Sequence, residues 1–316
     1  MNAAVCLGLP SIANLISRMP GGIAQGIIWG IMALGLYITF RLLDIADLTV
    51  DGSFATGGAV AIMLITSGCP AWAALIAALL AGTAAGLCTG VLHTRLGIPA
   101  ILSGILTQFA LYSINLRIMG MSANRSANPD TFKLLITMRS VPKAILTGAV
   151  LAAAIVAVMY WYFGTEQGSA IRATGSNPAM SRAQGINTNF NIVLGLAVSN
   201  ALVALSGALL SQYQGFADVG MGRGAIVIGL AAVIIGEAVF GRIFHNFALK
   251  MVSVSLGAII YYIVIQLVLT LGFDANLLKL LSASVVAVFL AVPYWKGRYF
   301  AKPAAKKANK EGANNA

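Results

Sequence analysis

Residues 71–93 read AWAALIAALLAGTAAGLCTGVLH and contain no Asp, Glu, Lys or Arg. A helix of about 20 apolar residues is long enough to cross the roughly 30 Å hydrocarbon layer of a bilayer. The stretch therefore predicts a membrane-spanning helix. Gly82, Gly86 and Gly90 recur at every fourth residue, a spacing typical of membrane helices that pack closely against a neighbour.

The composition of the whole chain extends this conclusion. Of the 316 residues, 59% are hydrophobic and 9% are charged, whereas about 25% of residues are charged in an ordinary soluble protein. These proportions exclude a conventional soluble fold and predict an all-α polytopic membrane protein. A hydropathy window predicts about nine transmembrane helices (8–10), at residues 22–40, 54–67, 71–93, 98–117, 143–163, 189–213, 224–241, 249–271 and 275–293.

The charged residues indicate orientation rather than a nucleic-acid partner. The formal net charge is +11, and the 20 Lys and Arg are spread through loops and a tail, without interleaved aromatic residues on one face. We expect one transmembrane domain over residues 1–295 and a basic cytoplasmic tail over residues 296–316. The tail cations are Lys296, Arg298, Lys302, Lys306, Lys307 and Lys310.

Cytoplasmic loops of membrane proteins carry an excess of Lys and Arg, so the tail fixes the predicted topology. Counting nine crossings back from it places the N-terminus outside. The same count places the loops near residues 93–95, 172–182 and 242–250 inside and residues 118–142 outside. The outside loop holds Arg125, Lys133 and Arg139, which runs against the usual bias. The three cysteines predict neither a disulfide framework nor a zinc site.

A polar stretch, LDIADLTVDGSF at residues 43–54, adjoins the short apolar segment 54–67. We interpret it as a break in the second helix at membrane depth, which must be buried in protein or line a wet cavity. The carboxylates have two interpretations. In the first, the carboxylates lie at the cytoplasmic interface, where Asp51 or Ser53 caps a helix that begins near Phe54. Alternatively, they form a polar elbow beside a substrate path, or a cation site.

The connection at about residues 164–188 contains the run GSAIRATGSNPAMSRAQGINTN. Asn177 is a favourable N-cap, Pro178 suits the first helical position, and Gly185 suits the left-handed residue that closes a helix. The pattern predicts a helix of about two turns, Pro178 to Gln184, at the membrane surface. The flanking Arg172 and Arg182 either anchor to lipid headgroups or contact a partner.

Glu237 lies within an apolar segment, VIIGEAVFG. An unpaired carboxylate is costly there, so Glu237 faces a polar cavity, pairs with a cation, or lies near the cytoplasmic end within reach of Arg242. It belongs to a second glycine-interrupted stretch, residues 215–237, which hints that the two halves of the chain are duplicated.

Motifs for catalysis are absent from the sequence. No run fits G-x-x-x-x-G-K-[ST], H-E-x-x-H or G-x-S-x-G. The chain is therefore expected to be neither an ATPase nor another enzyme. Two transport classes remain: a permease powered by separate subunits, and an ion-coupled secondary transporter that uses intramembrane carboxylates. A surface helix favours the permease, because a self-sufficient carrier needs no docking helix.

Two stretches, LDIADLTVDGSFATGGAV (43–60) and IRATGSNPAMSRAQGINTNF (171–190), resemble signatures of the permease subunits of bacterial ATP-binding-cassette importers. The similarity is to the branched-chain amino acid and ribose-type family, in a subgroup associated with amino-acid-like substrates, including aromatic ones. The resemblance implies a bacterial plasma (inner) membrane protein that works as a homodimer with two cytoplasmic ATPase subunits and an external substrate-binding protein. It also implies no cofactor in this chain, because the ATPase subunits bind ATP and Mg²⁺.

The resemblance adds a role for one group of candidate residues, and the residues themselves indicate the other. Residues 176–187 are similar to the coupling helix that inserts into each ATPase, and the IIGE run implies packing or gating without a further role. The coupling candidates are Arg172, Ser176, Asn177, Pro178, Ala179, Arg182, Gly185 and Asn187. The candidates for the pathway or elbow are Asp44, Asp47, Thr49, Asp51, Ser53, Phe54 and Glu237.

Overall fold

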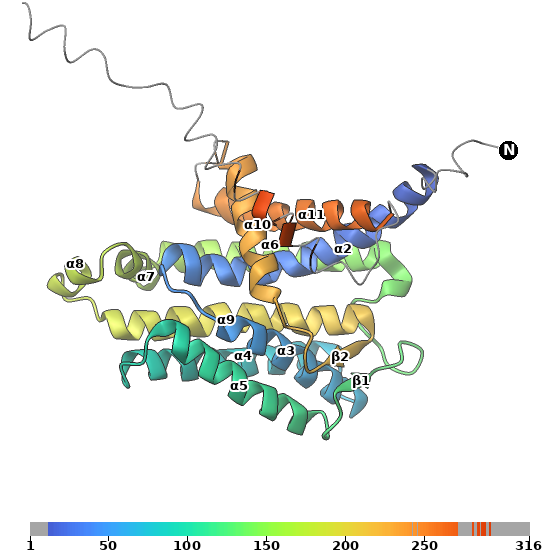
Figure 1. Cartoon of the computed structure of the whole chain (residues 1–316), viewed down its shortest axis with the longest axis horizontal. Helices are drawn as coiled ribbons and strands as arrows, with labels where there is room; N and C mark the ends of the chain where they lie inside the picture. The colour runs from blue at the N-terminus through green and yellow to red at the C-terminus, as the bar shows by residue number, and fades with distance from the viewer. Residues whose placement is uncertain are drawn as a thin grey trace, which may run out of the picture.

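The computed structural model describes residues 12–241, 243–244 and 246–270, with residues 280, 283–284, 286–288 and 291 beyond them. The described chain is a helical bundle whose long helices share one general direction (Figure 1). Its helices are α2 (Ile12–Leu36), the π-helix η1 (Tyr37–Leu42), α3 (Thr49–Thr66), α4 (Ala71–Thr94), α5 (Ala100–Ile118), the 3₁₀-helix η2 (Met138–Ser140), α6 (Val141–Gly164), α7 (Glu166–Ser176), α8 (Pro178–Ala183), α9 (Thr188–Gln214), α10 (Ala225–Phe240) and α11 (Phe247–Thr270). Two short strands are β1 (Asn124–Ser126) and β2 (Phe216–Asp218).

The polytopic helical class is confirmed, whereas the count of nine is not. Seven helices in the described ranges are long and apolar enough to cross a membrane, and α10 is a shorter apolar helix of 16 residues. Eight of the nine predicted segments therefore correspond to a helix. The ninth, 275–293, falls mostly outside the described residues, as does the whole tail 296–316.

The two ends of the bundle differ in structure. Helices α7 and α8 lie at one end, which we name the α8 end, and the β1–β2 pair lies at the other, which we name the β end (Figure 1). Strand β1 pairs antiparallel with β2, and the backbone N–H of Ala127 donates to the carbonyl of Gly215 at 2.9 Å. The loop after α5 is thus fastened to the end of α9. As the sequence predicted, the 118–142 loop and the α7–α8 connection lie on opposite sides.

The predicted break in the second helix is not confirmed, because the irregular residues lie before α3 rather than within it. Helix α3 begins at Thr49, five residues earlier than expected, and runs without interruption to Thr66. Residues 43–48 between η1 and α3 are not helical, and a second non-helical stretch, residues 219–224, precedes α10. Each half of the chain therefore holds one helix that starts after an irregular stretch.

Helix α9 is the centre of the bundle, with most of its side chains buried. A Cβ at Gly82, Gly86 or Gly90 would meet the α9 backbone, at Asn200, Leu196 and Val193 respectively. Lipid tails are as apolar as side chains, so membrane helices associate through close packing rather than through the hydrophobic effect. The glycine stripe in α4 thus has the role that its spacing predicted.

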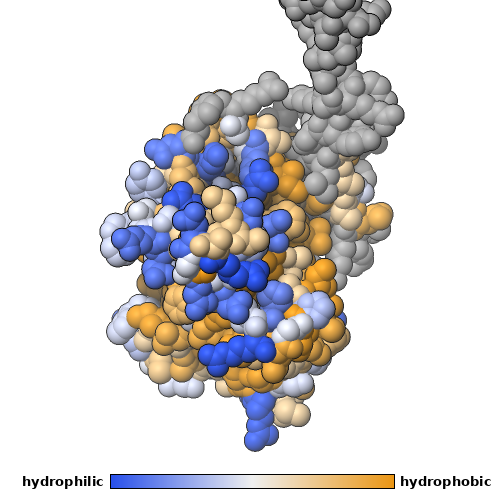
Figure 2. Space-filling model, turned by 90° about the vertical axis from the view of Figure 1, so that its left-hand side faces the viewer, coloured by the Kyte–Doolittle hydropathy of each residue, from blue (hydrophilic) through white to orange (hydrophobic). Residues whose placement is uncertain are grey.

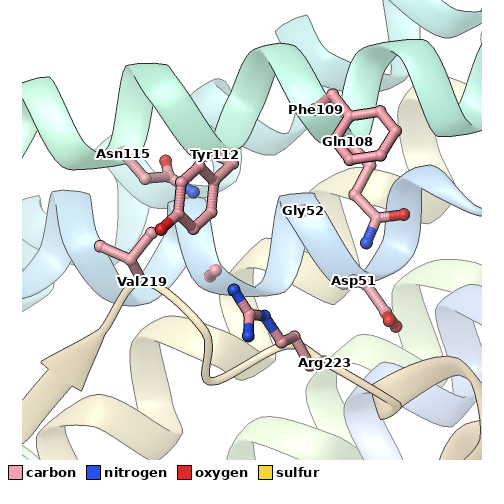
Figure 3. Close-up of a pocket in the computed structure, with 9 residues that line it drawn as sticks. Asp51, Gly52, Gln108, Phe109, Tyr112, Asn115, Val219 and Arg223 are labelled. Atoms are coloured by element: carbon pink, nitrogen blue, oxygen red, sulfur yellow. The ribbon is translucent and has the colours of Figure 1, made fainter. Parts of the chain in front are cut away.

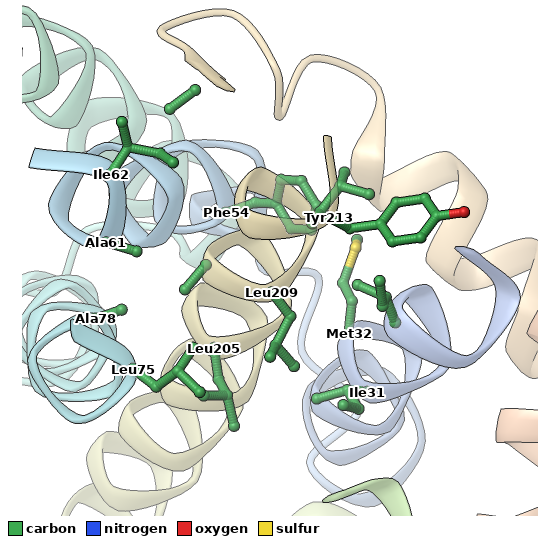
Figure 4. Close-up of a cluster of buried hydrophobic side chains, with 14 of the residues drawn as sticks. Ile31, Met32, Phe54, Ala61, Ile62, Leu75, Ala78, Leu205, Leu209 and Tyr213 are labelled. Atoms are coloured by element: carbon green, nitrogen blue, oxygen red, sulfur yellow. The ribbon is translucent and has the colours of Figure 1, made fainter. Parts of the chain in front are cut away.

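The largest core cluster joins α2, α3, α4 and α9 (Figure 4). Phe54 is fully buried there, and its ring centroid lies 4.9 Å from that of Trp29. Two serines of α9 also donate to backbone carbonyls of α2: Ser199 to Gly35 and Ser206 to Ile28, both at 2.7 Å. These contacts hold α2, α3 and α9 together next to the irregular stretches.

Candidate functional site

Helix α8 forms as its capping residues predict. The Asn177 side chain accepts a hydrogen bond from the backbone N–H of Met180 at 3.0 Å, Pro178 is the first helical residue, and Gly185 has φ +81°. The helix ends at Ala183, one residue earlier than expected. The Asn187 side chain then accepts from the N–H of Phe190 at 3.1 Å and so caps α9. Local sequence thus determines both the helix and its return to the membrane.

The surface of α8 is exposed, with Ser181 as its buried anchor. Ala179 and Arg182 are exposed, and the Met180 side chain is 61% exposed. Figure 2 shows the α8 end, where hydrophilic side chains gather, with hydrophobic surface around them. An exposed Met within a polar surface is typical of a protein contact. The sequence had not singled out Met180.

Helix α7 was not predicted from the sequence. Its residues were interpreted as part of a connecting loop. Its signal is Thr165, whose hydroxyl oxygen accepts from the N–H of Gly168 at 3.4 Å, followed by Glu166 in the first turn. Ser176 is the exposed last residue of α7. Helix α7 packs closely at Gly175, where a Cβ would clash with the carbonyl of Leu42.

Arg172 holds α7 against the bundle instead of extending α8. Its Nη2 donates to the carbonyl oxygen of Phe163 at 3.0 Å, and its guanidinium lies 5.4 Å from the ring centroid of Phe247. Arg172 thus connects α6, α7 and α11, so the structure gives it a packing role among the predicted coupling residues. Arg182, with its Nε 3.3 Å from the carbonyl of Pro178, remains on the α8 surface.

A groove of about 470 Å³ lies between α7 and the start of α9 at the α8 end. Glu166, Ala170, Ile186, Asn187 and Phe190 are among the residues that line it. Phe190 is exposed, so the groove presents an aromatic ring beside the α8 helix. The α8 end therefore combines a protruding helix with a neighbouring concave surface.

The carboxylate of Asp47 is 2% exposed and makes hydrogen bonds through both oxygens. Its Oδ1 accepts from the N–H of Thr49 at 2.9 Å, and its Oδ2 accepts from Asn200 Nδ2 at 2.7 Å. Asn200 in turn accepts from the Ser53 hydroxyl at 2.6 Å. The network fastens the first turn of α3 to the middle of the 27-residue helix α9. Asp47 therefore lies beside the middle of α9.

Asp51 caps a helix, but not the one that the sequence suggested. It lies inside α3, and its Oδ2 and Oδ1 accept from the N–H groups of Gly224 and Ile226 at 2.9 and 3.0 Å. A carboxylate stabilises a helix N-terminus because the first N–H groups have no partner within the helix and the helix dipole is positive there. Asp51 thus joins the start of α3 to the start of α10.

The other elbow candidates have separate positions. Asp44 is exposed and has φ 56°, whereas Ser53 and Phe54 are buried within α3. The hydroxyl oxygens of Thr49 and Thr89 lie 2.7 Å apart, so Thr49 contributes to the contact between α3 and α4. The three carboxylates therefore do not share one site.

Glu237 pairs with a cation far away in the sequence. Its Oε1 accepts from Arg41 Nε at 3.0 Å, and both side chains are partly exposed at the α8 end. Arg41 was not among the predicted residues, and the suggested partner Arg242 lies outside the described residues. The pair links the end of η1 to the last turn of α10.

A cavity of about 410 Å³ lies between α3, α5 and the stretch before α10 (Figure 3). Asp51 and Gly52 line it from α3, and Gln108, Tyr112 and Asn115 line it from α5. Figure 3 shows the guanidinium of Arg223 directed toward Tyr112, and it lies 5.9 Å from the ring centroid. Arg223 lies in the glycine-interrupted stretch 215–237, but no role was predicted for it from the sequence.

Within the described ranges, no group of three or more His, Cys, Asp or Glu residues could hold a metal ion. Several buried polar side chains are paired across helices, as Asp47 is with Asn200 and Thr49 with Thr89. Asn200 could have been found in the sequence as a polar residue in the middle of an apolar segment. The partners of Asp51 and Glu237 do not stand out in the sequence as polar residues within an apolar segment.

Comparison with known proteins identifies the family. Residues 19–292 match the model of the branched-chain amino acid transport system permease component. The chain is 38% identical over 280 residues to the tyrosine transport system permease protein of Clostridioides difficile, covering 89% of this chain and 91% of that protein. It is 34% identical to an uncharacterized protein of Rickettsia prowazekii, covering 84% and 94%. It is 27% identical to the ribose import permease of Escherichia coli K12, covering 80% and 75%.

The family model covers nearly the whole predicted transmembrane domain, and both stretches on which the resemblance rested, 43–60 and 171–190, lie within the matched residues. The chain belongs to the branched-chain amino acid transport system permease family, the membrane permeases of ATP-binding-cassette importers.

Proposed function

We propose that this permease forms the pathway for an amino acid or a close analogue, as a homodimer coupled through α8 to two cytoplasmic ATPase subunits. An external substrate-binding protein delivers the solute. The solute class is supported by the 38% identity to a tyrosine transport permease over 89% of the chain. The exposed α8 helix, with Met180 and Arg182 on its surface, is the structural observation that supports coupling.

The arrangement of α8 suits the transmission of movement. Caps at Asn177 and Asn187 fix both the start of α8 and its return into α9. Helix α9 is buried in the bundle and contacts α2, α3 and α4. A displacement of α8 by an ATPase would therefore reach the centre of the bundle through a rigid helix, which is how alternating access proceeds by rigid-body motion.

An ion-coupled carrier is less consistent with the carboxylates. Asp47 and Asp51 each accept a hydrogen bond on both oxygens, and Glu237 pairs with Arg41. N–H donors already occupy part of the coordination capacity of the two aspartates, which leaves fewer lone pairs than a carboxylate site for Na⁺ usually offers. The carboxylates are thus better explained as groups that connect helices through hydrogen bonds and an ion pair than as sites for Na⁺ or a proton.

ATP-driven uptake is the test of this function. Proteoliposomes that hold the permease and its ATPase subunits, with the binding protein outside and ATP inside, are expected to accumulate radiolabelled L-tyrosine. Uptake without ATP under an imposed Na⁺ or proton gradient would instead support the carrier. A complex that assembles but takes up no L-tyrosine, L-phenylalanine or L-leucine would contradict the proposed solute class.

Thiol labelling tests the proposed orientation, with the α8 end and tail cytoplasmic and the β end and N-terminus outside. Ala123 and Ala183 are exposed residues at the two ends, so Ala123→Cys and Ala183→Cys form a matched pair. The background should lack Cys6, Cys69 and Cys88. An impermeant thiol reagent applied to intact cells is expected to label Ala123→Cys alone. Labelling of Ala183→Cys alone would invert the topology.

A further inference from the structure

Arg223 lies near the middle of the bundle and has no ion-pair partner among the residues that the structure describes. It is the residue before Gly224, whose N–H is held by Asp51. Asp51 is two residues from Ser53, which binds Asn200 at the midpoint of α9. The ion pairs among the described residues are Arg41–Glu237 and Arg139–Asp130, so Arg223 has the Tyr112 ring as its side-chain contact.

An arginine at this depth requires water, a partner or a ligand. Insertion scales give a cost of about 2.5–3.5 kcal/mol for Arg at the centre of a membrane helix. The Arg223 side chain is exposed in the described chain and lines the 410 Å³ cavity. It therefore faces a space that solvent or solute can occupy.

A second polar group in the same cavity also lacks a partner. Asn115 is 0% exposed, and neither its Oδ1 nor its Nδ2 has a hydrogen bond to another described residue. Buried amides are almost always hydrogen-bonded, because leaving one unpaired costs about 1–3 kcal/mol. Asn115 lines the cavity beside Tyr112 (Figure 3). An unpaired cation thus faces the cavity, and an unpaired amide lies buried in its wall.

We propose that this cavity is a transient binding site for a zwitterionic α-amino acid in the pathway. The guanidinium of Arg223 binds the carboxylate, because its planar fork matches two carboxylate oxygens. Each oxygen of Asp51 retains a further lone pair that can accept from the ammonium group. Asn115 supplies an additional donor and acceptor. This inference rests on the proposed function and adds the solute-contacting residues.

The remaining lining fits the side chain of such a solute. Phe109 and Tyr112 present aromatic rings, and Ala55 and Val219 are apolar. A volume of about 410 Å³ lies within the range of about 300–1,000 Å³ for small-molecule sites. The cavity can therefore hold an amino acid with a large apolar or aromatic side chain.

Arg223 also lines a second cavity of about 690 Å³, between α2, α10 and α11. Gln25, Tyr262 and Gln266 are among its other lining residues. Arg223 thus stands where the two spaces meet at the start of α10. A residue in this position can hold the solute carboxylate while the solute passes from one space to the other.

Uptake of L-tyrosine by the reconstituted complex tests the site. Arg223→Gln is expected to lower uptake at saturating binding protein at least tenfold, and Arg223→Lys, which keeps the charge, is expected to lower it less. Arg117→Gln is the matched control, since Arg117 is an exposed arginine of α5 outside the cavity lining, and its uptake should stay within twofold of wild type. Copurified ATPase subunits verify that each variant assembles.

Charge rescue separates a solute contact from a structural role. Arg223→Cys in a background without the three native cysteines is treated with aminoethyl or sulfonatoethyl methanethiosulfonate. The positive adduct is expected to restore uptake and the negative one is not, and L-tyrosine should slow the labelling more than L-tyrosinamide, which lacks the carboxylate. Equal effects of the two reagents, or uptake by Arg223→Gln within twofold of wild type, would overturn the site. Failure of wild-type uptake would instead contradict the proposed function.

Discussion

Met180→Asp combined with Arg182→Glu is expected to remove the ATPase subunits from the purified permease. Met180 is the large exposed apolar residue of α8, and a few side chains near the centre of an interface contribute most of its binding energy. Both changes lie on the outer surface of a helix anchored through Ser181, so folding should be unaffected. Copurification is expected to fall at least tenfold, and ATP hydrolysis stimulated by loaded binding protein should fall with it.

The matched control is Met121→Asp, which introduces the same charge on an exposed Met at the β end. Met121 has φ 60°, a conformation that Asp tolerates better than most residues. This variant should retain the ATPase subunits. A Met180→Asp, Arg182→Glu protein that elutes as wild type and keeps its ATPase would show that α8 is not the docking surface.

Asp51→Ala is expected to destabilise the permease. The change leaves the N–H groups of Gly224 and Ile226 without acceptors. Gly224 is exposed and Ile226 is partly buried, so the loss is that of a helix cap, about 0.5–2 kcal/mol. Asp51→Asn keeps one acceptor oxygen and should lose about half as much. Both effects are measured as the midpoint temperature for loss of the monodisperse peak in detergent.

Asp44→Asn provides the comparison, because Asp44 is exposed and Asn tolerates its left-handed backbone. Its midpoint temperature should equal that of wild type. If Asp51→Ala and Asp44→Asn have the same midpoint temperature, the hydrogen bonds between Asp51 and the start of α10 do not stabilise the fold. A dependence of uptake on Na⁺ that disappears in Asp51→Asn would assign the carboxylate to ion coupling instead.

Several features of the molecule could be read from local sequence. The spans follow from runs of apolar residues in a chain with 9% charged residues. The α8 helix follows from Asn177, Pro178 and Gly185, since capping involves residues only a few positions apart. The stripe at Gly82, Gly86 and Gly90 predicted a close helix contact, which the structure assigns to α9. Neighbours in sequence decide these features, so no tertiary information was needed.

Other features depend on residues distant in the chain, and only the tertiary structure decided them. Asp51 looked like the cap of its own helix, yet it caps α10, 173 positions away at Gly224. Glu237 is paired with Arg41, 196 positions away, and Asp47 with Asn200. Composition and periodicity fix which residues are polar and how each helix starts. Which polar groups meet depends on how the helices pack, because a buried donor or acceptor is satisfied by whatever partner the packing brings within about 3 Å.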